Sequence, residues 1–135
     1  MSTAGEVRSL LDLGGRLADG SRRLPGLTGP RATCLVARQA LQLVVADLLA
    51  ARGLCPSGGS TRSRLICLSV AYEEQPAVGY RAGAAWARLS SGCHHHAYEL
   101  APTAGEVRAL LEEVAWLHQV QDQESSTTSG RTAPG

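Results

Sequence analysis

The stretch PRATCLVARQALQLVVADLLAARG, residues 30–53, decides the fold class. Its apolar residues recur every three or four positions, which is the spacing of one face of an α-helix. They are Ala37, Leu41, Val44, Val45, Leu48 and Leu49. Pro30 suits the first turn of a helix, and Gly53 suits the position just after its end. The stretch therefore predicts one long amphipathic helix over residues 31–52.

Two similar segments on either side also predict helices. TAGEVRSLLDL (residues 3–13) and TAGEVRALLEEV (residues 103–114) each place a Glu three residues after a Thr, which is the pattern of a capping box. Apolar residues follow both at helical spacing. The similarity is either an internal duplication or two similarly capped helices. We favour the second interpretation, because the matching residues of the two segments do not extend further along the chain.

Two more helices are expected between these segments. Ser60 or Thr61 caps one of them, and Pro76 opens the other, which fades at Gly92. No alternation with a period of two persists as a strand would require. We therefore predict an all-α protein, an up-and-down helical bundle of four to five helices.

The same patterns divide the chain into three parts. Residues 1–27 are expected to form an N-terminal helix and a flexible connector, and residues 28–121 the helical bundle domain. Residues 122–135 are polar and lack apolar anchors, so they are expected to be a disordered tail. The small aromatic content predicts a modest aliphatic core, and a homodimer would bury a further apolar face.

Composition excludes several classes of protein. The 13 basic and 12 acidic residues nearly balance, which argues against coating nucleic acid by bulk charge. All the basic residues are arginine, a bias that indicates GC-rich codon usage and a high-GC bacterial source. The N-terminus lacks the pattern of a signal peptide, and polar residues interrupt the apolar stretch, so we expect a cytoplasmic protein with no membrane contact. The four cysteines form no CxxC pair and predict no structural zinc site.

The segment RLSSGCHHHAYEL, residues 88–100, raises a chemical question. Positions seven apart on a helix return to nearly the same face, so Arg81, Arg88 and His95 align if the helix continues past Gly92. An imidazole transfers protons near neutral pH, and an arginine fork holds phosphate oxygens with two hydrogen bonds. Together these groups suit RNA cleavage through attack by the 2′-hydroxyl.

A small helical bundle with Arg-x(4–6)-His at the end of a late helix resembles the HEPN superfamily. Many members are metal-independent endoribonucleases of toxin–antitoxin and phage-defence systems, and act as dimers with the motif at the dimer cleft. The resemblance implies that Arg88 contacts phosphate, that His94 or His95 is the catalytic imidazole, and that no cofactor or metal is needed. Leu89 stands where the family usually has a polar residue.

Several alternatives stay open for these residues. Glu99 either orients an imidazole or pairs with Arg88, and Tyr98 either binds phosphate or packs. The three histidines are otherwise an exposed polar helix end, or hold a metal together with Cys93, Glu99 or His118. The competing function is a non-catalytic helical module that binds a protein partner.

Overall fold

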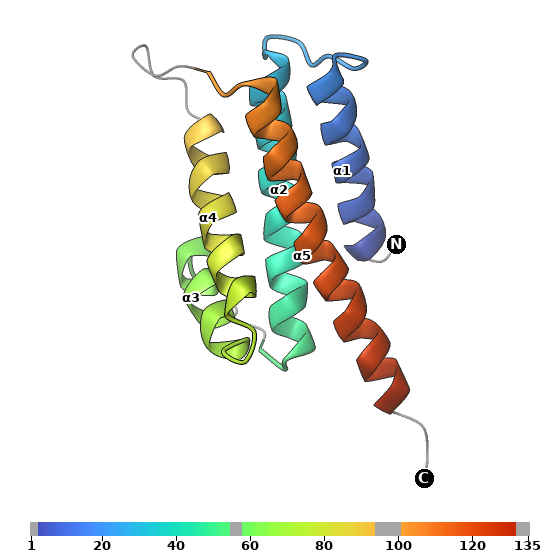
Figure 1. Cartoon of the computed structure of the whole chain (residues 1–135), viewed down its shortest axis with the longest axis vertical. Helices are drawn as coiled ribbons and strands as arrows, with labels where there is room; N and C mark the ends of the chain where they lie inside the picture. The colour runs from blue at the N-terminus through green and yellow to red at the C-terminus, as the bar shows by residue number, and fades with distance from the viewer. Residues whose placement is uncertain (1–2, 55–57, 94–100, 132–135) are drawn as a thin grey trace.

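The structure, a computed structural model, describes residues 3–54, 58–93 and 101–131. These residues form five α-helices (Figure 1): α1 (Thr3–Asp19), α2 (Gly29–Ala51), α3 (Thr61–Ala71), α4 (Pro76–Cys93) and α5 (Ala104–Arg131). The four long helices alternate in direction along the chain, and the short α3 packs beside α2 and α4. The predicted all-α, up-and-down bundle is confirmed.

α2 is the central helix of the bundle. It contacts each of the other four helices, and all six residues of the predicted apolar stripe are buried. Pro30 lies in its first turn, and Gly53 follows its end with a φ of 76°, a conformation that glycine adopts without strain. By length and composition alone α2 is apolar enough to cross a membrane, but the core helix of a soluble protein passes the same test.

Side-chain caps begin two of the helices as the sequence predicts. At the start of α5, the Glu106 amide donates to Thr103 Oγ1 (3.1 Å), and the Thr103 amide donates to Glu106 Oε2 (3.3 Å). This reciprocal pair is a capping box. At the start of α3, Ser60 Oγ accepts from the Ser63 amide at 3.2 Å, so Ser60 rather than Thr61 is the cap.

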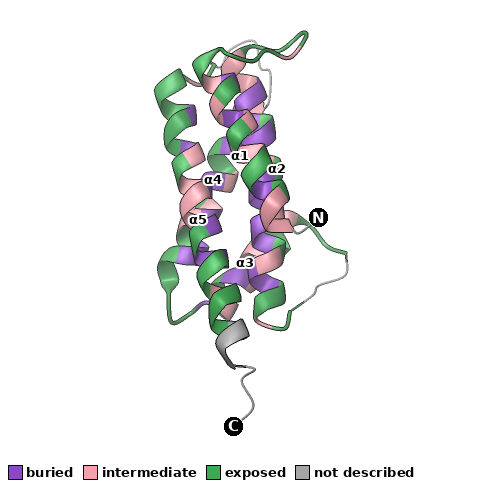
Figure 2. Ribbon diagram, turned by 90° about the vertical axis from the view of Figure 1, so that its right-hand side faces the viewer, coloured by how far each residue is buried: buried purple, intermediate pink, exposed green. Residues whose placement is uncertain are grey.

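α1 belongs to the same bundle as the other helices. Its residues Val7 and Leu17 are buried, and α1 packs against α2 and α5. Gly14 leaves room for Leu111 of α5, since a Cβ there would lie 2.8 Å from Leu111 Cδ2. Figure 2 shows the buried positions along the inner sides of the helices. The division at residue 27 therefore separates segments that share one core.

The C-terminal segment differs from the sequence expectation. α5 continues to Arg131, ten residues into the predicted disordered tail that begins at residue 122. Its first part is tied to the bundle by polar contacts, because Glu124 accepts two hydrogen bonds from Arg52 of the α2 C-cap. The prediction of a disordered tail was based on the lack of apolar residues in this segment, and a polar contact such as that between Glu124 and Arg52 has no apolar signal in the sequence.

Candidate functional site

Arg88 lies on the outer surface of α4, close to the C-terminal end of that helix. Its side chain is exposed, and none of the hydrogen bonds and ion pairs within the described ranges involves it. Leu89, the next residue, is fully buried in the core. Successive side chains on a helix diverge by about 100°. Leu89, which stands where the HEPN family usually has a polar residue, therefore packs into the core, and the Arg88 guanidinium points outward.

The end of α4 is fixed against α2. α4 finishes at Cys93, so the Arg-x(5)-His spacing extends across the C-terminal end of the helix. A Cβ at Gly92 would lie 2.6 Å from Cys34 Sγ, so only glycine allows α4 to approach α2 this closely. The predicted residues His94, His95, Tyr98 and Glu99, together with His96, lie outside the described residues.

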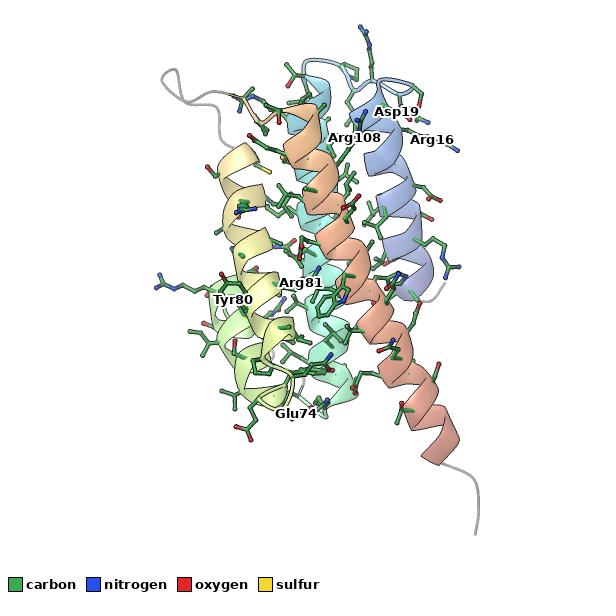
Figure 3. The ribbon with its side chains drawn as sticks, viewed as in Figure 1. Arg16, Asp19, Glu74, Tyr80, Arg81 and Arg108 are labelled. Atoms are coloured by element: carbon green, nitrogen blue, oxygen red, sulfur yellow. The ribbon has the colours of Figure 1, made fainter. Side chains whose placement is uncertain are left out.

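Arg81, predicted to support Arg88 from the same face, contacts α5. Its Nε and Nη2 donate to the two carboxylate oxygens of Glu113 at 2.6 and 3.1 Å, and its guanidinium lies 3.8 Å from the centre of the Trp116 ring. Figure 3 shows Arg81 on the side of α4 that faces α5. A bidentate ion pair and a cation–π contact occupy the fork, so Arg81 joins two helices here and does not extend the exposed surface around Arg88.

Arginines cover aromatic rings at two other helix contacts. The Arg38 guanidinium lies 5.2 Å from the ring centre of Trp86, and that of Arg52 lies 4.0 Å from the ring centre of Tyr72. These arginines serve packing between helices. They differ in this respect from the exposed Arg88.

Six arginines, five of them exposed and Arg31 partly buried, gather at the end of the bundle where α4 finishes. The C-terminal end of α1, the N-terminal ends of α2 and α5 and the C-terminal end of α4 all meet there (Figure 1). We call this region the basic end, and define it by Arg16, Arg22, Arg23, Arg31, Arg88 and Arg108. Within two turns of this end, the described residues include three acidic ones, Asp12, Asp19 and Glu106.

The connector between α1 and α2 holds part of the basic end in a folded turn. Gly20 has a φ of 83° just after α1, and the Arg22 amide donates to the Arg16 carbonyl at 3.2 Å. The Ser21 amide donates to Asp19 Oδ1 at 2.8 Å. Hydrogen bonds from Ser21 lower the pKa of Asp19, and the positive charge of Arg108 adds to this effect. Figure 3 shows Arg16, Asp19 and Arg108 together at this end.

His118 lies in a buried polar cluster that the sequence did not predict. Its Nδ1 is 3.0 Å from Gln121 Oε1, and Gln121 Nε2 donates to Asp47 Oδ2 on α2. Burial raises the pKa of Asp47, and the nearby charge of Glu6 acts in the same direction. His118 Nε2 has no hydrogen-bond partner among the described residues and lies 4.0 Å from Asp122 Oδ2.

The position of His118 separates it from the motif on α4. It is fourteen residues beyond Ala104 on α5, which corresponds to roughly 21 Å along the helix axis. The basic end includes the start of α5, so His118 lies well down the bundle from it. The cluster of His118, Gln121 and Asp47 joins α5 to α2.

The two cysteines near the end of α4 are poor nucleophiles. Burial raises the pKa of Cys34 to about 11, and burial also raises the pKa of Cys93. Both thiols therefore stay protonated near neutral pH, whereas metal binding and nucleophilic attack need the thiolate. Across the described ranges, no group of three or more His, Cys, Asp or Glu side chains is placed to hold a metal ion.

No family model, curated protein or solved structure matches the chain. Function is therefore inferred from the residues themselves. Sequence reasoning singled out Arg88 but missed the other members of the basic end. In the sequence these residues can be recognised as arginines near the ends of helices, including the pair Arg22 and Arg23 in the first connector.

Proposed function

We propose that the protein is a HEPN-like helical domain that binds and cleaves RNA without a metal, in the cytoplasm of a bacterium and as a homodimer. The observation that carries the proposal is the exposed guanidinium of Arg88, six residues before His94 and beside the fixed end of α4. Other arginines of this bundle are engaged with aromatic rings, such as Arg81 on Trp116. Arg88 is available to a phosphate.

The proposed reaction is an internal transfer at phosphorus. The 2′-oxygen of a ribose attacks the adjacent phosphorus, and the bond from phosphorus to the 5′-oxygen breaks. A base takes the proton of the 2′-hydroxyl, and an acid gives a proton to the leaving 5′-oxygen. His94 or His95 supplies the imidazole for these proton transfers, and Arg88 stabilises the charge on the phosphorane oxygens. The products are a 2′,3′-cyclic phosphate and a 5′-hydroxyl.

The test of this function uses the purified full chain with single-stranded RNA in the presence of a chelator. We expect cleavage that resists chelation and leaves 2′,3′-cyclic phosphate ends. DNA of the same sequence is the control and should stay intact, because it has no 2′-hydroxyl. Absence of both RNA binding and RNA cleavage would overturn the proposal, and so would cleavage that needs an added metal or that acts equally on DNA.

A second function is favoured by a separate observation. Ile66, Val70 and Tyr80 are exposed to 61%, 67% and 80%, although they are large apolar or aromatic residues. Val70 and Tyr80 directly follow Ser69 and Gly79 in the sequence, and α3 and α4 approach closely at those two residues, where a Cβ on Gly79 would be 2.9 Å from the Ser69 Cα. Ile66 lies one turn before Val70 on α3. Exposed apolar groups of this kind are typical of protein-binding surfaces. This patch would serve the non-catalytic interaction module.

Self-association tests whether this patch is an interface between two copies of the chain. We expect sedimentation velocity to show a concentration-dependent dimer for the wild-type chain and a monomer for the double variant Val70→Asp/Tyr80→Asp, because a carboxylate is costly to bury in an apolar interface. Arg62→Ala, a change at an exposed position of α3, is the control and should dimerise as the wild type does. A wild-type dimer that survives the double variant would show that the patch is not the dimer interface.

A further inference from the structure

We infer that the basic end is the RNA-binding surface, and that it holds the phosphate backbone of a single strand that runs from the α1–α2 connector to the end of α4. The inference rests on the proposed function and extends it by naming the residues that bind the RNA. Arg22 and Arg23 of the connector are exposed, as are Arg16 of α1 and Arg108 of α5. Arg88 lies near the same end of the bundle on α4.

The charge distribution supports this placement. The chain has a formal net charge of only +1, yet six arginines and three acidic residues lie within two turns of this end in the described part of the chain. Two helix N-termini and two helix C-termini meet there, so the helix dipoles largely cancel and the formal charges decide the potential. A polyanion therefore meets a local positive field that the overall charge does not reveal.

The geometry of the connector supports phosphate contacts. The hydrogen bond from the Arg22 amide to the Arg16 carbonyl folds the chain back after α1, which places Arg22 and Arg23 beside the end of the bundle. Arg16 and Arg108 come from two different helices, yet both charges act on Asp19. Arginine forks spread over several elements suit a phosphate backbone, which repeats a charge along its length. Base edges need not be contacted for this kind of binding.

The contact between α4 and α2 brings the end of α4 to the same end of the bundle as the connector. The close approach of Gly92 to Cys34 places the end of α4 against the N-terminal part of α2, and Arg31 lies in the first turn of α2. A strand bound along the connector thus reaches the segment that carries the reaction in the proposed function. Binding and cleavage are then carried by different arginines, which allows them to be separated by experiment.

The test measures binding of a labelled single-stranded 2′-O-methyl RNA, which cannot be cleaved through its 2′-oxygen, by fluorescence anisotropy at several salt concentrations. The variant is Arg22→Ala/Arg23→Ala. We expect binding about three- to tenfold weaker at low salt, and a plot of log Kd against log salt whose slope falls by about 1.4, since each lost contact with single-stranded nucleic acid contributes about 0.7.

A matched control removes the same charge elsewhere. Arg62→Ala/Arg64→Ala changes two arginines at the start of α3, where Thr61 accepts a hydrogen bond from Gln42 of α2. Gln42 lies thirteen residues beyond Gly29, which is roughly 20 Å along α2 from the basic end. We expect binding close to that of the wild type. Equal losses in both double variants, or no loss in the first, would overturn the inference.

The outcomes also separate this inference from the proposed function. RNA cleavage by a protein whose binding is unaffected by Arg22→Ala/Arg23→Ala would retain the nuclease and reject the basic end as its binding surface. Binding that depends on Arg22 and Arg23 in a protein that cleaves no RNA would retain the surface and reject the nuclease. Circular dichroism and a thermal melt verify that both double variants are folded.

Discussion

Arg88→Ala is expected to reduce RNA cleavage by about 10²- to 10³-fold while leaving the free energy of unfolding within about 0.5 kcal/mol of the wild type. The loss in rate follows from removing the donor that stabilises the phosphorane oxygens. The fold should not change, because Arg88 is exposed and no hydrogen bond or ion pair within the described residues depends on it. Single-turnover cleavage and a urea melt measure the two quantities.

Two further variants sharpen this result. Arg88→Lys keeps the positive charge but loses the planar fork, so we expect its rate to lie between those of the wild type and Arg88→Ala. Arg62→Ala removes an exposed arginine at the start of α3 and should cleave as the wild type does. Cleavage by Arg88→Ala at the wild-type rate would place the reaction elsewhere on the molecule.

Local features of this fold could be predicted from the sequence. The apolar stripe of α2 follows from helical periodicity, and its residues are buried as predicted. The capping box of Thr103 and Glu106 depends on residues three positions apart, and it forms as predicted. Both signals are contained within a few turns of one helix, so they need no knowledge of the neighbouring helices.

Features that depend on distant residues could not be predicted in this way. The extension of α5 is held partly by Glu124, whose partner Arg52 is 72 residues away in the sequence. The role of Arg81 depends on Glu113, which is 32 residues away. The sequence does not show which distant residue a polar side chain pairs with. For this reason residues 122–135 were expected to be a disordered tail, and Arg81 was expected to belong to the site around Arg88.

The candidate site likewise combines a feature that is local in the sequence with one that depends on distant residues. The spacing from Arg88 to His94 is readable in the sequence, and the exposure of Arg88 agrees with a role at the surface. The basic end is formed by arginines from four helices and a connector, so its existence depends on which helix ends meet. A net charge of +1 argued against binding nucleic acid by bulk charge, and that argument does not apply to a local cluster.

Arg52→Ala is expected to lower the free energy of unfolding by about 2–4 kcal/mol, the largest effect on stability that we predict for an arginine in this chain. Arg52 donates to both carboxylate oxygens of Glu124 on α5, at 3.2 and 3.1 Å, and to the carbonyl of Ala71 at the end of α3, at 3.0 Å. Its Nη2 also lies 2.5 Å from Glu74, in the turn before α4. One side chain thus joins the end of α2 to three other segments.

The aromatic ring beneath Arg52 adds to this loss. Tyr72 is fully buried, donates its hydroxyl hydrogen bond to the Leu48 carbonyl at 2.8 Å, and carries the Arg52 guanidinium 4.0 Å above its ring centre. Removing the arginine exposes this face of the ring to water and leaves the partly buried Glu124 without the bidentate partner it has here. The pKa of Arg52 is raised, chiefly by its hydrogen bond with Glu124, so the fork is charged at every pH used for a melt.

Urea denaturation followed by circular dichroism measures the effect of Arg52→Ala, with Arg62→Ala as the control for loss of one exposed arginine. Arg52→Lys should recover part of the stability, because a lysine can pair with one carboxylate but cannot form the bidentate contact or reach Ala71 at the same time. The loss should be independent of the basic end, so Arg52→Ala should bind 2′-O-methyl RNA as the wild type does under conditions where it is folded. A stability equal to that of Arg62→Ala would show that α5 is held by its apolar residues alone, and that the polar contacts of Glu124 do not extend the helix.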